Sequence, residues 1–181
     1  KFIYEGIWYR TKAINEGLRN AKTKFVAIYD TDVIFPPENI VKAYELLKEG
    51  HTLVYSYSGK FVDINRNYIY DGVIKEKESY VSGSYGGAVF VNKEKYRKCG
   101  WENENIIGWG FEDFERVARV RTLGHSIVRV EGTCFHIQHP INQHSSPQNP
   151  FWKRNEGEYY RIKNLSKAEL EEEIKKWQWA E

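Results

Sequence analysis

The chain has 181 residues, 41% of them hydrophobic, so it is long enough to bury one sizeable core and too apolar to be disordered as a whole. Its net charge of +2 is too small and too evenly spread to indicate nucleic acid or an anionic membrane as a partner. Two cysteines, Cys99 and Cys134, are too few for a disulfide framework, although one bridge between them stays open, and no apolar run reaches the roughly 20 residues that cross a membrane.

The first half of the sequence alternates helix and strand patterns. Apolar residues at helical spacing predict a helix from Ile7 to Asn20, and the apolar run over 24–29 predicts a strand buried on both faces of a parallel sheet. A Pro-Pro pair opens a second helix that ends at Gly50, and a second strand follows over 52–57. The order helix, strand, helix, strand predicts an α/β domain.

The second half has a less regular start. Residues 58–84 are polar, aromatic and weakly periodic, and we interpret them as an excursion or loop. A capping box at Ser166–Glu169 predicts the start of a last helix. The other elements predicted are strands over 88–91, 126–130 and 133–137 and helices over 93–98, 112–123 and 152–162.

Two acidic residues follow directly on the first predicted strand. Asp30 and Asp32 lie at its carboxyl end, where ligands bind in open α/β sheets, and alternation predicts that both point to the same side. Two close carboxylates repel each other, and Mn²⁺ or Mg²⁺ relieves that repulsion by accepting oxygen ligands. A pair of solvated loop acids is the alternative interpretation of this motif when it stands alone.

Two histidines follow the last predicted strand. His136 and His139 do not share a face of an extended backbone, so a turn is needed to bring them together. Satisfied surface histidines are the alternative. With an acidic pair at another strand end, the two imidazoles form a plausible mixed nitrogen and oxygen ligand set for Mn²⁺.

A third motif, Gly-Trp-Gly-Phe-Glu-Asp over 108–113, ends in two acids at the start of a predicted helix. The helix dipole favours negative charge there, so Glu112 and Asp113 are expected to stay ionised, and either is then able to take a proton from a hydroxyl. Acids that merely cap the helix, with Trp109 in the core, are the alternative.

These motifs, in this order, resemble a family 2 glycosyltransferase with a galactosyltransferase-type C-terminal half. The similarity extends to β-1,4-galactosyltransferases and to bacterial chondroitin-polymerase-like enzymes, and it covers roughly residues 5–140. The stretches that carry it are Trp8-Tyr9-Arg10-Thr11-Lys12-Ala13-Ile14-Asn15-Glu16-Gly17, the Asp30-Thr31-Asp32 motif, Gly86-Gly87, the Gly-Trp-Gly-Phe-Glu-Asp stretch and the His-x-x-His pair.

The resemblance implies a glycosyltransferase A fold, a Rossmann-like mixed sheet flanked by helices, and a metal-dependent transfer of a hexose or N-acetylhexosamine. The donor is expected to be a nucleotide diphosphate sugar, UDP-linked, and the acceptor a saccharide. The implied donor-binding residues are Trp8, Arg10, Asp30, Asp32, Gly86, Gly87 and Trp109; the implied metal ligands are Asp32, His136 and His139; and the implied catalytic residues are Asp113 as base and Glu112 as acceptor ligand.

The resemblance also bears on the extent of the chain. Members of the family begin with strands that cradle the uridine, and we expect these to lie before Lys1, so that residues 1–181 are the C-terminal part of one catalytic domain with a helical tail over 150–181. The lack of an initiator methionine and of a signal sequence agrees with a piece of a longer protein. We expect a cytoplasmic location, or attachment to a membrane through parts outside this chain.

Two other functions remain open on sequence grounds. A carbohydrate-binding fragment uses aromatic rings without turnover, and the aromatic content of 15% suits it. A phosphatase with an Asp-x-Asp motif at a strand end is the second, although the Gly-Trp-Gly-Phe-Glu-Asp stretch has no role there. Release of a nucleotide diphosphate in the presence of Mn²⁺ separates the transferase from both.

Overall fold

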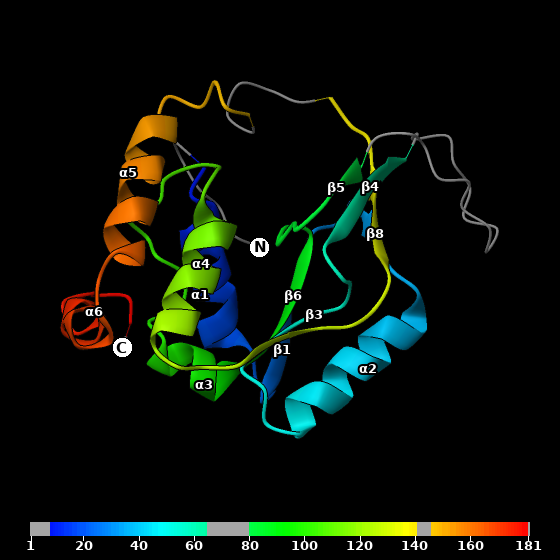
Figure 1. Ribbon diagram of the computed structural model, residues 1–181, viewed down its shortest axis with the longest axis horizontal. Coiled ribbons are helices and arrows are strands. Elements are labelled where there is room, and N and C mark those ends of the chain that lie inside the picture. The colour runs from blue at the N-terminus through cyan, green and yellow to red at the C-terminus, as the bar shows by residue number, and fades with distance from the viewer. Residues whose placement is uncertain (1–7, 65–79, 141–145, 181) are drawn as a thin grey trace.

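The computed structural model describes residues 8–64, 80–140 and 146–180, which form two small β-sheets with helices packed around them (Figure 1). The helices of this part of the chain are α1 (Arg10–Asn20), α2 (Pro37–Lys48), α3 (Lys93–Lys98), α4 (Glu112–Thr122), α5 (Trp152–Lys163) and α6 (Lys167–Ile174). Its strands are β1 (Phe25–Tyr29), β2 (Val33–Ile34), β3 (Leu53–Tyr55), β4 (Lys60–Ile64), β5 (Tyr80–Val81), β6 (Ala88–Asn92), β7 (Ile127–Arg129) and β8 (Thr133–Ile137).

The first sheet has the strand order β1-β6-β3-β7, in which β6 is antiparallel to both of its neighbours and β3 is parallel to β7. The prediction that β1 is buried on both faces of a parallel sheet is therefore wrong. Within the described residues β1 is an edge strand, and Tyr29 at its end is 39% exposed. A continuous apolar run shows that a strand is at least half buried, but it does not reveal which strand will pair with it.

The second sheet has the order β2-β8-β4-β5, with β4 and β8 parallel and the outer pairs antiparallel. It corrects the interpretation of 58–84 as a loop, since β4 and β5 lie there; residues 65–79 of that stretch are outside the described part. Val62 and Ile64 of β4 are buried while Asp63 between them is partly exposed, so the period-2 signal exists. This alternation covers only five residues and continues into a polar stretch, so it gives a weak strand signal. Strand β2 has two residues and is too short to show any period.

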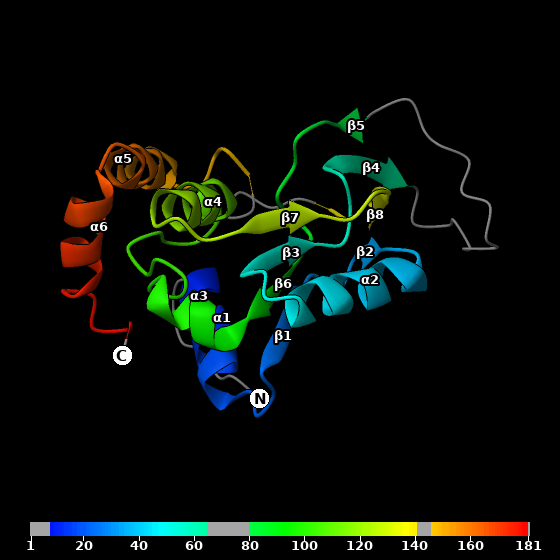
Figure 2. The same ribbon diagram turned by 60° about the horizontal axis from the view of Figure 1, so that its bottom comes forward.

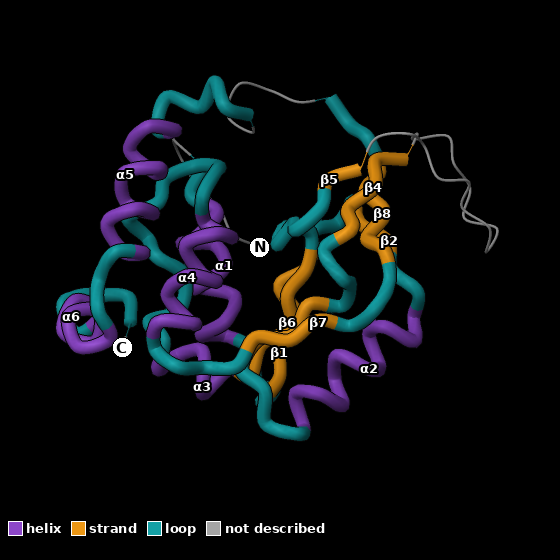
Figure 3. The backbone as a smooth tube through the Cα atoms, viewed as in Figure 1, coloured by secondary structure: helices purple, strands orange, loops and turns teal. Residues whose placement is uncertain are grey.

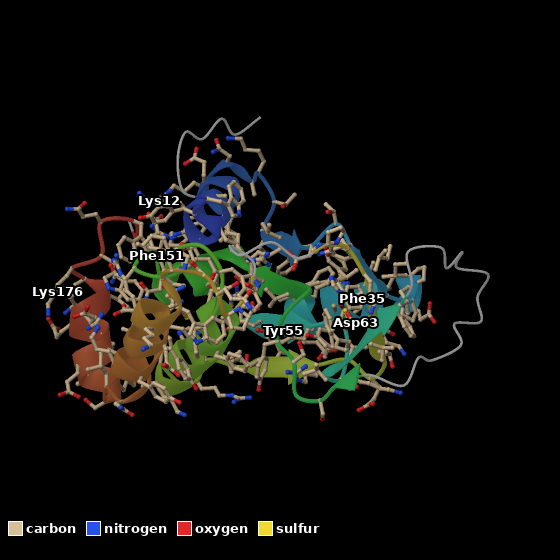
Figure 4. The ribbon with its side chains drawn as sticks, turned by 90° about the horizontal axis from the view of Figure 1, so that it is seen from above. Lys12, Phe35, Tyr55, Asp63, Phe151 and Lys176 are labelled. Carbon is tan, nitrogen blue, oxygen red and sulfur yellow. The ribbon has the colours of Figure 1, made fainter. Side chains whose placement is uncertain are left out.

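The helices lie mostly on one side of the sheets (Figure 3), and α2 lies alone on the other side. Helix α2 packs on β3 and β6 through buried Ala43 and Leu47, while α5 and α6 pack on α4 away from the strands (Figure 2). Tyr55 of β3 is fully buried in the middle of the molecule, between the helices and the second sheet (Figure 4). The predicted capping box at Ser166 and Glu169 is confirmed. Cys99 and Cys134 are buried free thiols, so the bridge left open above is not formed.

Helix α4 buries charged side chains as well as valines. Arg119 pairs with Glu115 at 2.7 Å and donates to the carbonyl oxygens of Cys99 and Trp101. Arg116 forms a two-pronged pair with Glu102, at 2.8 and 3.0 Å. These contacts hold the loop over 99–103 against α4, and removing one partner of such a buried pair costs about 3–5 kcal/mol.

Candidate active site

A cavity of about 740 Å³ lies between the second sheet and the first turn of α4. It brings together residues from sequence positions that are far apart. The residues singled out from sequence that line it are Arg10, Asp30, Asp32, Gly86, Gly87, Trp109, Glu112, Asp113, His136 and His139. Trp8 does not line it: this side chain is 55% exposed and lies in a neighbouring groove between α1 and β1.

The two aspartates of the Asp-x-Asp motif lie in a turn between β1 and β2. The Asp30 carbonyl accepts a hydrogen bond from the Val33 N–H, so the backbone reverses and does not stay extended. The expectation of an extended backbone is therefore wrong, although both aspartates line the same cavity. Asp30 is held by Arg10 at 2.7 Å, whereas Asp32 faces the two histidines.

Asp32, His136 and His139 form a compact cluster, with ligand atoms within 4.8 Å of one another. Asp32 Oδ2 lies 3.1 Å from His139 Nε2 and 3.7 Å from His136 Nε2. The two imidazoles do come together, with 5.4 Å between their ring centroids, because β8 ends at Ile137 and His139 lies beyond it. The Ile137 N–H donates to the Asp32 carbonyl at 2.7 Å, which fixes the aspartate beside the end of β8.

The donor set of this cluster fits a divalent transition metal. Two imidazole nitrogens and one carboxylate oxygen suit Mn²⁺ and its neighbours in the first transition row, whereas Mg²⁺ prefers oxygen ligands alone. The Nδ1 atoms are engaged elsewhere: that of His139 lies 3.0 Å from the Pro140 carbonyl, and that of His136 lies 2.7 Å from Asp63 Oδ1. A carbonyl or carboxylate oxygen accepts hydrogen bonds, so in the neutral tautomer that fits these contacts Nδ1 carries the N–H and Nε2 keeps its lone pair for a metal.

Asp63 is a site residue that the sequence did not reveal. It lies on β4 directly opposite His136 in the parallel pair of β4 and β8, and it orients that imidazole toward Asp32. Its carboxylate comes from a stretch that was interpreted as a loop. The alternation of buried Val62 and Ile64 around it is the one signal in the sequence that points to its position on a strand.

The two acids at the start of α4 have different surroundings. Glu112 is 4% exposed and accepts a hydrogen bond from the Gly110 N–H at 2.8 Å, whereas the Asp113 side chain is 24% exposed. Arg116 donates to Asp113 Oδ1 at 2.6 Å, and the other oxygen, Oδ2, lies toward Gly86. Arg116 thus connects Asp113 to the buried Glu102, and it holds this carboxylate in one position at the cavity wall.

The turn before α4 depends on glycine. Gly110 has a φ of 106°, and a Cβ atom there would lie 2.8 Å from the Trp152 ring. Only glycine therefore lets the Trp152 ring pack against this turn. The same ring stacks on Trp109, with 5.6 Å between ring centroids. Trp109 remains 36% exposed and presents its other side to the cavity.

Arg10 lies between the two acidic motifs. Arg10 pairs with Asp30, and its Nε atom also lies 3.6 Å from Glu112 Oε1. This Nε atom is buried and has no hydrogen-bond partner among the described residues. On the facing wall, Gly87 has a φ of 83° and its carbonyl accepts from the Asp30 N–H at 2.8 Å. A side chain at Gly87 would meet Cys134, Phe61 and Val33 at 3.2 Å, so the close packing of this backbone on the second sheet requires glycine.

Burial and the neighbouring charge of Asp113 raise the pKa of Glu112 to about 7 from its ordinary 4.5. The expectation that the helix dipole keeps this acid ionised is therefore wrong, because the cost of removing the charge from water is larger than the benefit of the helix start. Near neutral pH the Glu112 carboxyl is present in both protonation states and is able either to donate or to accept a hydrogen bond.

This shift predicts how stability depends on pH. A carboxyl with a raised folded-state pKa contributes stability that is complete below pH 4.5 and is lost as the pH rises through about 7. Between pH 5 and pH 8 we therefore expect the free energy of unfolding of the unchanged chain to fall by on the order of 3 kcal/mol more than that of the Glu112→Gln variant. Urea unfolding at both pH values measures this difference, and parallel pH profiles for the two proteins would contradict it.

The mixed sheets and the helices packed around them are those of the glycosyltransferase A fold, as predicted. Residues 8–105 match glycosyl transferase family 2, and because this match covers more than half of the chain, the chain belongs to that family. Residues 74–140 match the N-terminal domain of galactosyltransferase. A search of curated proteins finds no significant match.

Two solved structures show the same likeness. A mutant of Drosophila β1,4-galactosyltransferase 7 in complex with manganese, UDP-Gal and xylobiose is 22% identical over 74% of this chain and 52% of its own, with a TM-score of 0.53. The catalytic domain of Drosophila β1,4-galactosyltransferase 7 in complex with xylobiose is 23% identical over 68% of this chain and 45% of its own, with a TM-score of 0.48. The chain therefore spans about half the length of the solved structures that it matches.

No helix among residues 8–64, 80–140 and 146–180 combines the length and the apolar character of a membrane span.

Proposed function

We propose that this chain is a catalytic domain that transfers a hexose or N-acetylhexosamine from a UDP-sugar to a saccharide acceptor, with inversion at the anomeric carbon. One observation carries the proposal: the cluster of Asp32, His136 and His139 and the carboxylate of Asp113 line the same cavity. A metal site and a partly exposed base on walls of one cavity are what a single displacement at a sugar carbon requires. Membership of glycosyl transferase family 2 supports the same reaction class.

The metal that fits this donor set is Mn²⁺, held by Asp32, His136 and His139. When bound, it neutralises the negative charge that develops on the departing diphosphate. Arg10 adds a positive charge, held by Asp30, on the same side of the cavity. Gly86 and Gly87 admit the donor sugar close to the backbone, and Trp109 provides an aromatic face on which a sugar ring packs.

Asp113 is the base in this proposal. Arg116 fixes one of its oxygens, so that the other is able to remove the proton from the attacking acceptor hydroxyl. Glu112 orients the acceptor or the helix start, and its raised pKa allows it to donate a hydrogen bond to a sugar oxygen at neutral pH. In an Asp-x-Asp phosphatase the first aspartate attacks phosphorus, and here that residue, Asp30, is paired with Arg10 instead.

The direct test is transfer from a panel of UDP-sugars with Mn²⁺, scored by UDP release and by mass spectrometry of the product. UDP-Gal is the first donor and xylobiose the first acceptor, because a mutant of a galactosyltransferase with this fold has been solved with both. We expect UDP release that depends on Mn²⁺ and stops with a chelator. Saccharide binding without any UDP release would instead favour the carbohydrate-binding interpretation.

A residue behind the metal site provides a separate prediction. Asp63→Asn removes the negative charge that orients His136 and makes its Nε2 a better ligand, so we expect Mn²⁺ to bind about 10-fold more weakly. Titration calorimetry with Mn²⁺ and no donor measures the change. Asp63→Ala, which also removes the hydrogen bond, is expected to have the larger effect of the two.

Glu131→Gln is the matched control for Asp63→Asn. Glu131 is an exposed acid just before β8 and outside the cavity. Its substitution by glutamine removes the same charge as Asp63→Asn but leaves the contact between Asp63 and His136 in place. An equal loss of Mn²⁺ affinity in Glu131→Gln and Asp63→Asn would mean that general charge, and not the contact with His136, sets the affinity.

A further inference from the structure

A band of aromatic rings extends from the cavity onto the outer surface of α4 and α5. Phe114, which follows the proposed base, lines the cavity and is 50% exposed. Its ring lies 6.3 Å from that of Tyr159, and Tyr159 lies 5.0 Å from Tyr160, which is 49% exposed. We call Phe114, Tyr159 and Tyr160 the aromatic track.

The packing of α5 accounts for Tyr159, whose ring stacks on that of Phe111 with 5.8 Å between centroids, but not for Tyr160. The buried residues of α5 are Asn155 and Ile162, which face α4 and the loop before it, and Tyr160 lies away from that face. Tyr160 is half exposed, and exposed aromatic rings that adjoin one another beside a cavity are typical of a binding surface. Helices α4 and α5 lie side by side in both views of the ribbon (Figures 1 and 2). Phe114 lines the cavity and contacts Tyr159, which in turn contacts Tyr160, so the track is continuous with the cavity wall.

The chemistry of the track fits a saccharide chain. Each pyranose ring has an apolar face of C–H groups that packs on an aromatic ring, while its hydroxyl groups remain free for water and polar side chains. Lys163 places its ammonium group over both tyrosine rings, at 5.4 and 5.8 Å, where it is also able to donate to sugar oxygens.

We propose that the acceptor is an oligosaccharide whose terminal sugar reaches Asp113 in the cavity while the following units stack on the aromatic track. This proposal rests on the glycosyltransferase function proposed above and names its acceptor class. It predicts that affinity rises with acceptor length up to the end of the track, and that the gain depends on the rings of α5.

The test compares xylobiose with xylohexaose, and a β-1,4-linked glucose disaccharide with the hexasaccharide, as ligands of the full chain in the presence of Mn²⁺ and UDP. Calorimetry gives the dissociation constants, and transfer assays give KM where turnover occurs. In the unchanged chain, we expect a hexasaccharide to bind at least about 10-fold more tightly than the disaccharide of its series. Tyr160→Ala is expected to weaken hexasaccharide binding about three- to tenfold and disaccharide binding less than twofold, which corresponds to the loss of one ring contact.

Two variants keep the result interpretable. Tyr160→Phe retains the ring and is expected to bind the hexasaccharide normally, and Tyr44→Ala removes an aromatic ring that is 48% exposed on α2, remote from the cavity, and is expected to change nothing. Equal affinity for both lengths in both series, or an equal effect of Tyr160→Ala on both lengths, would overturn the proposal even if xylobiose is a good acceptor. Absence of both transfer and saccharide binding would instead overturn the proposed function itself.

Discussion

Replacing Asp113 with asparagine is expected to lower kcat by about 10²- to 10⁴-fold at saturating donor and acceptor, which is the range for loss of a general base. Asparagine has the same shape but cannot take a proton from the acceptor hydroxyl. The carboxylate lies at the cavity wall with one oxygen held by Arg116 at 2.6 Å, so its position relative to the acceptor is fixed before the reaction. Mn²⁺ and donor affinities are expected to remain almost unchanged, since Asp113 is not part of the Asp32 cluster.

Glu112→Gln is the companion variant. Glu112 is nearly inaccessible to solvent and is bonded to the Gly110 N–H, so we expect its amide to raise the acceptor KM more than it lowers kcat. If Glu112→Gln abolishes turnover and Asp113→Asn does not, the two roles are exchanged. If neither variant changes either parameter, both acids serve only the start of α4.

The second large effect concerns the metal. Asp32→Ala removes the one carboxylate of the cluster, and we expect Mn²⁺ binding to weaken at least about 100-fold, with loss of metal-dependent UDP release. Calorimetry with Mn²⁺ alone measures the binding and does not depend on turnover. A double His136→Ala and His139→Ala variant is expected to lose affinity to a similar extent, and the two single variants show which imidazole contributes more.

Two controls sharpen the metal experiment. His125→Gln removes an imidazole that lies outside the cavity beside Thr52, and it is expected to bind Mn²⁺ normally. Asp30→Asn changes the other acid of the motif, which is paired with Arg10, and is expected to weaken Mn²⁺ binding far less than Asp32→Ala. Unchanged affinity in both Asp32→Ala and the double histidine variant would show that this cluster is not the metal site.

Much of the fold was predictable because local patterns determine local elements. Helix α2 begins at Pro37 as the Pro-Pro pair predicts, β8 spans the predicted residues, and Ser166 caps α6 through the predicted box. Each of these signals lies within a few residues of the element that it predicts. Strand β4 was missed because its local pattern is weak: it has only five residues and continues into a polar stretch.

The sequence by itself determined the α/β class through its local patterns, and its resemblance to a glycosyltransferase family singled out ten of the residues that line the cavity, although Trp8 lies outside it. Only the tertiary structure decided which of these residues lie together and what surrounds each of them. It separated Asp30 from Asp32 by a turn, brought Asp63 to His136 across 73 residues of sequence, and buried Glu112 deeply enough to raise its pKa to about 7. Strand register, turn geometry and desolvation depend on contacts between distant parts of the chain, and a pattern of neighbouring residues contains no information about them.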